Sequence, residues 1–329
     1  MGLRWGFMGT GRIANVVAKD FKIAGMNIQA VGSRNLDSAK TFAKEHGVSH
    51  AHGSYEELVA NPNVDIVYIS TLNYVHCENA LLAINAGKHV LLEKPFTMDA
   101  KQARKIQKAA RAKNVFVMEA MWSRFLPSMD AVFEVLKKGT IGMPNLVMAD
   151  HSQYLPPEVS TRMWELHTGG GALLDLGIYP ISFAARVLGL PDEVLAVGRL
   201  AFEGMDEATS MVFNYESGAQ AALTTCMTVA GPVTATILGD KGSIEIDNTF
   251  YAQTSFTVYD NERKVVQRYD TPPVPGTGRQ LQALHAEKCI ADGLIESPIM
   301  SVEESVDLMQ IMDDIRLEIG VVWDYEDVI

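Results

Sequence analysis

The chain has 329 residues, of which 47% are hydrophobic and 21% charged. This length exceeds one typical hydrophobic core, so we expect a soluble globular protein with two domains. Residues 1–120 hold 15 Lys and Arg against 10 Asp and Glu, whereas residues 121–329 hold 13 against 30. The acidic part disfavours nucleic acid as a partner. The mildly basic part suits a small anionic ligand such as a dinucleotide phosphate.

Three cysteines, an odd number without a C-x-x-C pair, favour free thiols in a reducing compartment: Cys77, Cys226 and Cys289. Residues 1–8 lack the features of a secretory signal, and we find no uninterrupted apolar run long enough to cross a bilayer. We therefore expect a cytoplasmic protein without a membrane partner. No metal site is expected, since His46, His50 and His52 are interpreted as loop residues without ordered ligand spacing.

A glycine-rich turn follows the first apolar segment. Residues 3–8 predict a strand, and Val16, Val17 and Phe21 recur at helical spacing after the turn. Between them lies a G-x-G-x-x-A pattern, in which glycines allow close approach to a pyrophosphate and helix N–H groups bind it. The pattern predicts these cofactor-binding residues: Gly9, Thr10, Gly11, Arg12 and Ile13.

The second predicted strand, residues 28–31, leads into Ser33 and Arg34. An acidic residue at this place would bind the ribose 2′-hydroxyl of NAD, whereas an arginine accommodates the 2′-phosphate of NADP. We therefore predict NADP(H) in preference to NAD(H). Asp37 nearby argues against this preference, and a solvated surface charge is the alternative interpretation of Arg34.

Two further apolar segments end in polar residues. Residues 64–71 predict a strand buried on both faces, which places Thr71, Asn73 and His76 at the carboxyl edge of the sheet. The next strand ends at Glu93 and Lys94, and a lysine at the end of a buried strand is a candidate functional group. An exposed lysine without function is the alternative.

A second candidate site follows the triple glycine at residues 169–171. Asp175 and Tyr179 are four residues apart, which places them on one face of a predicted helix. A lysine together with an Asp/Tyr pair could move a proton while a cofactor moves a hydride. Lys94, Tyr179 and Asp175 are therefore the predicted catalytic residues.

These motifs together resemble the glucose-fructose oxidoreductase, inositol dehydrogenase and MocA family. Residues 118–125 and the tyrosine at position 179 are similar to the branch that contains dimeric dihydrodiol dehydrogenase and NADP-dependent D-xylose dehydrogenase. The resemblance implies that Lys94 and Tyr179 handle the proton with Asp175 beside them. It also implies that Trp122 and Arg124 help to hold cofactor or substrate. Leu72 departs from the pattern, because much of the wider family has proline there.

The predicted fold is an α/β Rossmann domain at residues 1–120, followed by an α+β domain at residues 121–329. The second domain contains longer strands joined by short turns, which indicates a large, open, mostly antiparallel sheet. The open face favours a homodimer, which the resemblance also implies. Residues 301–304 predict a capping box that begins the final helix, which is a candidate to pack back on the first domain.

The predicted function is reversible hydride transfer between NADP(H) and a carbinol or carbonyl carbon of a sugar, a vicinal diol or a related small carbonyl compound. A non-catalytic NADP-binding sensor or regulator is the main alternative, and redox-assisted glycoside cleavage is a third. Neither the physiological substrate nor the direction of the reaction follows from the sequence. His151, Trp164 and His167 are candidates to line the substrate pocket, with loop packing as the alternative.

Overall fold

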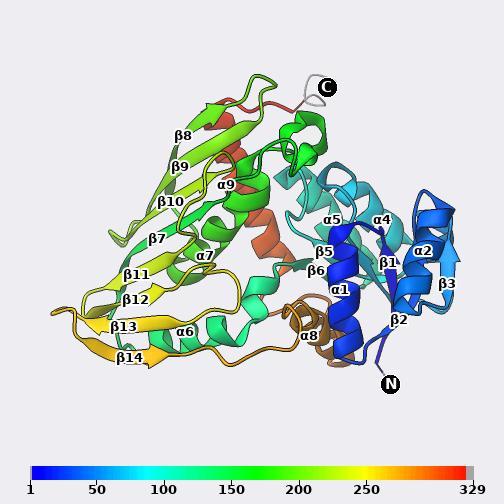
Figure 1. Ribbon diagram of the computed structural model, residues 1–329, viewed down its shortest axis with the longest axis horizontal. Helices are drawn as coiled ribbons and strands as arrows, with labels where there is room; N and C mark the ends of the chain where they lie inside the picture. The colour runs from blue at the N-terminus through cyan, green and yellow to red at the C-terminus, as the bar shows by residue number, and fades with distance from the viewer. Residues whose placement is uncertain (1, 324–329) are drawn as a thin grey trace. The chain divides into compact units, whose positions relative to one another are not determined.

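The computed structural model describes residues 2–323, which form two compact units (Figure 1). The first unit extends to Phe125 and includes Pro273–Val306, whereas the second contains Leu126–Pro272 and the chain from Asp307 onward. Residues 324–329 of the expected second domain lie outside the described residues.

The first unit contains a six-stranded sheet in which every strand is parallel to its neighbours, in the order β3-β2-β1-β4-β5-β6. Helices connect consecutive strands, as a parallel sheet requires. This arrangement confirms the predicted Rossmann domain. The strands are β1 (Arg4–Met8), β2 (Asn27–Gly32), β3 (His50–His52), β4 (Ile66–Ile69), β5 (His89–Glu93) and β6 (Val117–Ala120), and the helices are α1 (Arg12–Ile23), α2 (Leu36–His46), α3 (Tyr55–Ala60), α4 (His76–Asn85), α5 (Ala100–Lys113) and α8 (Gln280–Ala291).

The prediction of a loop around the three histidines was wrong for all of them. His50 and His52 lie in β3, where His50 pairs with Ala30 and His52 with Gly32 of β2. The third, His46, ends α2. The strand has only three residues and lies at the edge of the sheet, so it carries no run of apolar residues by which the sequence could reveal it.

Aromatic packing fixes α1 against β1. Trp5 and Phe7 of β1 both meet the ring of Phe21 edge-on, at centroid distances of 4.9 and 5.2 Å. All three side chains are fully buried. Edge-to-face contacts of this kind add to the stabilisation from burial, so the helix that follows the glycine-rich turn has a defined position on the sheet.

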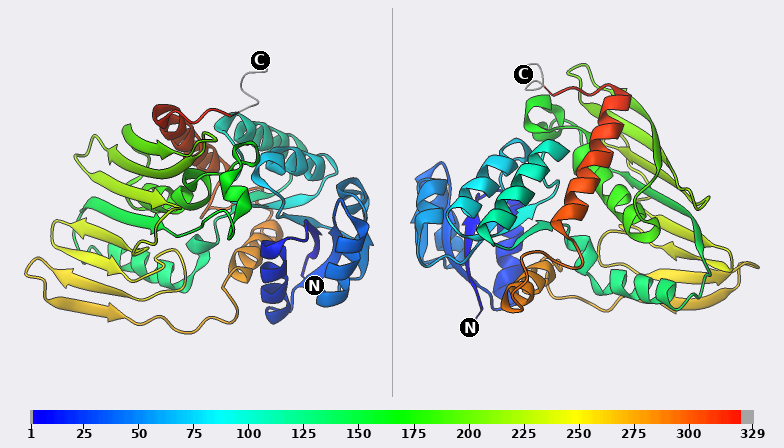
Figure 2. Two further views of the ribbon diagram at one scale, coloured as in Figure 1. Left: turned by 45° about the horizontal axis from the view of Figure 1, so that its top comes forward. Right: turned by 180° about the vertical axis from the view of Figure 1, so that it is seen from behind.

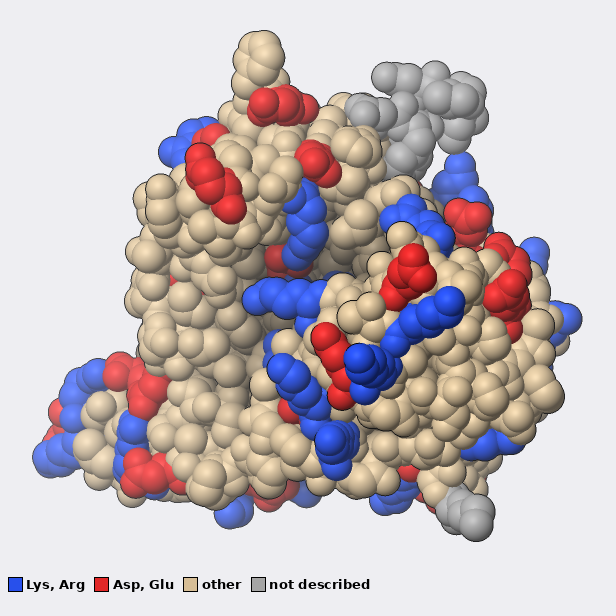
Figure 3. All heavy atoms as spheres, turned by 45° about the vertical axis from the view of Figure 1, so that its right-hand side comes forward, with Lys and Arg blue, Asp and Glu red and all other residues tan. Residues whose placement is uncertain are grey.

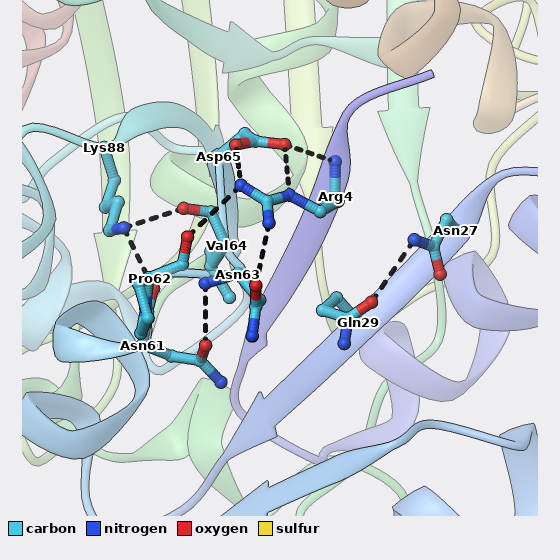
Figure 4. Close-up of polar contacts among 9 residues, drawn as sticks. All are labelled: Arg4, Asn27, Gln29, Asn61, Pro62, Asn63, Val64, Asp65 and Lys88. Atoms are coloured by element: carbon cyan, nitrogen blue, oxygen red, sulfur yellow. Dashed lines mark hydrogen bonds and ion pairs between the residues drawn. The ribbon is translucent and has the colours of Figure 1, made fainter. Parts of the chain in front are cut away.

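An ion pair joins the amino ends of β1 and β4 (Figure 4). The Arg4 guanidinium donates to Asp65 Oδ1 at 2.7 Å, and the Arg4 backbone N–H donates to Asp65 Oδ2 at 2.9 Å. Asn63 accepts a further hydrogen bond from Arg4 at 2.9 Å. The Arg4 hydrogen bond lowers the pKa of Asp65, although burial opposes it. These contacts hold the register at the edge of the sheet opposite the glycine-rich turn.

The chain returns to the first unit long after the expected boundary at residue 120. In this returning segment, Glu287 of α8 accepts a hydrogen bond from the Trp5 indole at 2.8 Å. Asp20 of α1 accepts from the backbone N–H of Thr277 at 3.0 Å. Composition alone does not reveal such a return, because the contacts join residues more than 250 positions apart.

The second unit contains an eight-stranded sheet in the order β14-β13-β12-β11-β7-β10-β9-β8. Only β7 and β10 pair in parallel among these strands, which confirms the predicted large, mostly antiparallel sheet. Two strands, β13 and β14, were not predicted. The strands are β7 (Pro144–Ser152), β8 (Glu193–Leu200), β9 (Asp206–Asn214), β10 (Gln220–Cys226), β11 (Ala235–Gly239), β12 (Gly242–Ile246), β13 (Phe256–Asp260) and β14 (Val265–Tyr269).

Three helices cover one face of this sheet: α6 (Pro127–Lys137), α7 (Ile178–Leu188) and α9 (Val302–Ile319) (Figure 2). Buried and exposed residues alternate along β10, as expected when helices cover one face only. The predicted cap of α9 is present, because the Ser301 hydroxyl accepts from the Glu304 backbone N–H at 3.1 Å.

One helical stretch, Leu166–Leu188, is long and apolar enough to pass a test for a membrane span. Of its apolar 18-residue window, 78% is buried inside the protein, so burial in the core accounts for its apolar character. On the face drawn in Figure 3, basic and acidic side chains lie interspersed, without one dominant patch of either sign on that face.

Candidate functional site

The first unit has a cleft of about 890 Å³ at the carboxyl ends of β1, β2 and β4. Ligands of doubly wound folds bind at this edge of the sheet. The cleft brings together six residues that the sequence predicted for cofactor binding, from three separate stretches: Gly9, Thr10, Gly11, Ser33, Arg34 and Thr71.

The glycine-rich turn has the geometry that its sequence predicts. Gly9 has a φ of +107°, and a Cβ there would lie 3.1 Å from the backbone oxygen of Ser70. Gly11 precedes α1, and a Cβ there would meet nothing within 4 Å, so the space beside the start of the helix is open. Arg12 and Ile13 contribute the first N–H groups of the helix, which lack partners inside an α-helix. This turn therefore fits a pyrophosphate.

Beyond β2, Ser33 and Arg34 differ in their surroundings. Ser33 is buried, and its hydroxyl accepts from the Asn35 backbone N–H at 3.2 Å. Arg34 is exposed and lines the cleft. Burial raises the pKa of Tyr55, and the nearby Arg34 guanidinium opposes this effect. The sequence analysis did not include Tyr55, which lines the same cleft from the first turn of α3.

His76 ties two loops of the first unit together. Its ring is fully buried, with Nδ1 2.9 Å from the Pro95 carbonyl oxygen and Nε2 3.2 Å from the Thr71 carbonyl oxygen. Thr71 follows β4 and Pro95 follows β5, so the histidine links the ends of two neighbouring strands. Asn73 is also buried, whereas Leu72 is 36% exposed and lines the cleft.

Lys94 directly follows β5 and is half-buried. The Lys94–Pro95 peptide bond is cis. Glu93 beside it is buried and accepts a hydrogen bond from the Tyr68 hydroxyl at 2.5 Å. Burial raises the pKa of Glu93, while the Tyr68 hydrogen bond and the Lys94 charge oppose the rise. The lysine thus follows a buried carboxyl group that is itself held in place.

Trp122 and Arg124 contact the returning segment of the first unit. The Arg279 guanidinium lies 4.0 Å above the centre of the Trp122 ring, a cation–π geometry. Arg124 is 3% exposed and donates to Glu304 at 2.6 Å and to the Ile299 carbonyl at 3.2 Å. These contacts hold the turn after β6 against the start of α9.

A buried carboxyl group lies near this arginine. Glu119 in β6 is 1% exposed, and burial raises its pKa to about 7. The Ser305 hydroxyl and the charge of Arg124 act in the opposite direction. The sequence analysis included Glu119 only within the motif at residues 118–125. Its contact with Ser305 of α9 joins distant parts of the chain, so the local sequence does not reveal it.

In the second unit, Asp175 lies in a π-helical turn, Leu173–Gly177, and Tyr179 lies in α7 immediately after it. The expectation of one regular α-helical face for both residues was therefore wrong. Pro180 lacks an N–H group, so the α-helical hydrogen bond to residue 176 cannot form at this point. Asp175 Oδ1 forms an ion pair with the Arg162 guanidinium at a distance of 2.9 Å. The sequence analysis did not predict this pair.

Asp206 of β9 anchors the start of this π-helical turn. Its carboxylate accepts from the Leu173 backbone N–H at 2.8 Å and from the Thr209 hydroxyl at 3.1 Å. Burial raises the pKa of Asp206 to about 6, although these hydrogen bonds oppose the rise. Gly171 has a φ of +104°, and a Cβ there would lie 2.3 Å from Asp206 Oδ1. This contact explains why a glycine precedes the turn.

Of the three residues considered for the pocket, His151 contacts the Tyr179 ring edge-on, at a centroid distance of 5.2 Å. Trp164 donates from its indole to the Leu155 carbonyl at 2.8 Å and packs against a small apolar cluster. His167 is exposed. Tyr251, which the sequence analysis did not consider, stacks on Tyr179 at 4.1 Å.

The described residues contain no group of three or more His, Cys, Asp or Glu side chains that could hold a metal ion. Cys77, Cys226 and Cys289 are not joined by disulfides. Burial raises the pKa of Cys77 to about 11, so this thiol is a poor nucleophile at neutral pH.

Comparison with family models matches both units of the chain. Residues 3–121 match the oxidoreductase family with an NAD-binding Rossmann fold that is designated GFO/IDH/MocA. Residues 129–245 match the C-terminal domain of the same family.

Similar proteins extend over nearly the full chain. The trans-1,2-dihydrobenzene-1,2-diol dehydrogenase of Xenopus laevis is 37% identical and covers 98% of this chain and 100% of its own. The enzyme of the same name from Homo sapiens is 33% identical, with 98% of both chains covered.

Among solved structures, a 3-ketoreductase from Actinomadura kijaniata in complex with NADP and TDP-benzene is 27% identical, with a TM-score of 0.85. The alignment covers 97% of this chain and 98% of that one. An aldose-aldose oxidoreductase from Caulobacter crescentus has the same fold, with a TM-score of 0.88 at 23% identity over 97% of this chain and 98% of its own.

Proposed function

The chain belongs to the GFO/IDH/MocA family of oxidoreductases, and we propose that it is an NADP(H)-dependent dehydrogenase or reductase. Its substrates would be sugars, vicinal diols or related small carbonyl compounds, interconverted between carbinol and carbonyl. Lys94 and Tyr179 would handle the proton. The proposal goes beyond family membership in the cofactor preference, the proton-handling pair and the substrate class.

The observation that carries the proposal is Arg34 in the same cleft as the glycine-rich turn. A guanidinium group suits a phosphate, because its planar set of donors matches the phosphate oxygens. Ser33 precedes it at the end of β2, where an acidic residue would be expected for NAD. Asp37 in the first turn of α2 and Glu56, which also lines the cleft, are charges that oppose this preference.

NADP(H), when bound, would supply or accept the hydride. Tyr179 exchanges the hydroxyl proton of the substrate, and the Lys94 ammonium group stabilises the oxyanion that develops on the reacting carbon's oxygen. Asp175, held by Arg162 at 2.9 Å, accepts a hydrogen bond from a second substrate hydroxyl. A vicinal diol or a sugar supplies that second hydroxyl, which supports the proposed substrate class.

The names of similar proteins point to the same chemistry. The relatives from Xenopus laevis and Homo sapiens are named for a cyclic vicinal diol. The 3-ketoreductase from Actinomadura kijaniata has bound NADP. We extend these properties to the present chain as part of the proposal.

Purified protein should be tested with NADPH and NADH against dicarbonyls and ketosugars, and with NADP⁺ and NAD⁺ against aldoses and cyclic diols. We expect turnover at the nicotinamide absorbance with the phosphorylated cofactor favoured in kcat/KM. Equal or better use of NADH would contradict the cofactor assignment. Tight NADPH binding without turnover of any compound would instead favour the sensor or regulator.

We also propose that two copies associate through the uncovered face of the second unit's sheet. Exposed apolar residues on this face include Met148, Leu195, Val197 and Val212, and they line a hollow of about 590 Å³. Val197 is 78% exposed, so a charge there would oppose association. We expect sedimentation to show a dimer at micromolar concentration and Val197→Asp to dissociate it; a wild-type monomer would contradict the proposal.

A further inference from the structure

An aromatic cluster surrounds Tyr179 in the second unit. The Tyr251 ring stacks on the Tyr179 ring, with centroids 4.1 Å apart and planes inclined by 28°. The His151 ring meets both, at 5.2 Å from Tyr179 and 4.5 Å from Tyr251. Tyr179 is 7% exposed and His151 is 1% exposed. Two rings from distant parts of the chain therefore define the orientation of this phenol.

Hydrogen bonds fix the two supporting rings. His151 Nδ1 lies 2.9 Å from the Leu176 carbonyl oxygen, which can only accept, so this nitrogen carries a proton. In the neutral ring, Nε2 then accepts from the Gln153 amide nitrogen at 2.9 Å. The same amide nitrogen donates to the Tyr251 hydroxyl oxygen at 3.0 Å. The chain of hydrogen bonds thus runs from Leu176 through His151 and Gln153 to Tyr251.

The Leu176 carbonyl accepts this bond for a local reason. The N–H group four residues later would normally bind it, but residue 180 is proline. Within the turn, the Leu176 carbonyl oxygen accepts from the backbone N–H of Ile178. The His151 ring is a second donor to the same oxygen. Since Leu176 lies three residues before Tyr179, the hydrogen-bonded chain begins just before the phenol and ends at Tyr251, whose ring stacks on it.

The loop that carries Tyr251 is also anchored in the core. Phe250 is 1% exposed and packs on Phe183 of α7 at a centroid distance of 5.5 Å. Gln153 is held from its backbone, which donates to the Cys226 carbonyl at 2.8 Å. Tyr251 is therefore presented to Tyr179 by packing that does not depend on the stacked ring itself.

We propose that Tyr251 is a positioning residue for Tyr179, and that His151 and Gln153 orient Tyr251. This inference rests on the proposed function, because it assigns Tyr179 to proton exchange. A phenol that transfers a proton must keep its oxygen within hydrogen-bonding reach of the substrate oxygen. Stacking restricts the rotation of the Tyr179 ring, so its hydroxyl oxygen keeps one direction.

The test compares variants that separate the ring from its hydroxyl. Tyr251→Leu removes the stack and should lower kcat by about 10²-fold, the scale of a small misplacement of a catalytic group, while KM for NADPH stays the same. Tyr251→Phe keeps the stack and should restore most of the turnover. Tyr269→Leu is the matched control, because Tyr269 also stacks on an aromatic ring of the second unit, Phe256, at 4.9 Å.

A double-mutant cycle gives a result that a purely structural role would not. In the Tyr179→Phe background, Tyr251→Leu should cause no further loss of kcat. NMR spectra of protein with ¹³C-labelled tyrosine identify the Tyr179 signal by its loss in Tyr179→Phe. This signal should shift in Tyr251→Leu and stay unchanged in Tyr269→Leu. An unmoved signal would overturn the inference whether or not a substrate is known.

Two further outcomes separate this inference from the proposed function. If Tyr179→Phe loses turnover and Tyr251→Leu does not, the positioning role is wrong and the proposed function stands. If Tyr179→Phe keeps normal turnover, or the wild type is inert toward every compound, the proposed proton transfer is wrong and the positioning role falls with it.

Discussion

The cleft of the first unit and the aromatic cluster of the second are built in different ways. The cleft depends on backbone geometry: a glycine with φ of +107° and the open start of a helix lie within three residues of each other. The cluster depends on side chains: Tyr251 stacks on Tyr179, and the Gln153 side chain that binds Tyr251 lies 98 residues away from it in the chain. A backbone site is therefore visible as a local motif, whereas a side-chain site is not.

The comparison also shows how each region tolerates change. In the cleft, the turn requires the backbone conformation of Gly9, with φ of +107°. In the cluster, each ring contributes a surface that another ring contacts. We therefore expect substitutions in the cluster to affect turnover and substitutions in the cleft to affect cofactor binding.

The largest effect should come from the proposed proton-handling pair. Tyr179→Phe and Lys94→Ala should each lower kcat by about 10²- to 10⁴-fold, the usual contribution of general acid–base catalysis. NADPH binding, followed by fluorescence titration, should remain because neither change touches the glycine-rich turn. Near-normal turnover in both variants would contradict the proposed proton-handling role of Lys94 and Tyr179.

The next effect concerns stability rather than turnover. The pKa of Glu119 is raised from 4.5 to about 7, so the folded protein binds this proton more tightly than the unfolded chain does. Its contribution to stability is full below pH 4.5 and is lost as the pH rises through about 7. Glu119→Gln removes this loss, and its stability relative to wild type should increase between pH 5 and pH 8 by up to about 3 kcal/mol.

Denaturant unfolding at several pH values measures this difference. Glu45→Gln is the control, since Glu45 is exposed on α2. A difference between wild type and Glu119→Gln that stays constant from pH 5 to pH 8 would show that Glu119 does not titrate in this range.

A smaller effect should separate the two cofactors. Arg34→Ala removes the charge proposed to bind the 2′-phosphate, and hydrogen bonds to charged groups contribute about 1.5–3 kcal/mol. The ratio of kcat/KM for NADPH over NADH should therefore fall by about 10- to 100-fold. Lys44→Ala, an exposed cation on α2, should leave the ratio unchanged. If both variants lower the ratio equally, general electrostatic attraction rather than Arg34 sets the preference.

The smallest effect should come from Gly11→Thr. Gly11 has extended backbone with φ of −70°, which threonine adopts readily, and threonine is a good helix cap. Its side chain would project into the open space beside the helix and weaken NADPH binding by about tenfold, or about 1.4 kcal/mol. The melting temperature without cofactor should be unchanged or higher. Unaltered binding would show that the cofactor does not approach this position.

Much of the first unit could be predicted because its signals are local. The strand before Gly9, the helix after it and the apolar run before Thr71 follow from short-range periodicity and from the special conformation of glycine. Strand β3 was missed because three residues at a sheet edge show no such pattern. The return of α8 to the first unit was not predicted, because Trp5 and Glu287 meet only in the folded chain.

In the second unit, the sequence by itself determined an open, mostly antiparallel sheet, without β13 and β14, and a helix carrying Tyr179. Alternating apolar residues and turn residues encode the sheet over short distances. Only the tertiary structure decided that Tyr251 stacks on Tyr179 and that Arg162 pairs with Asp175. It also decided that Asp206 anchors the π-helical turn that contains Asp175. Such contacts depend on which strands and loops lie side by side in the folded chain. The local sequence pattern does not predict packing between residues that are far apart in the chain.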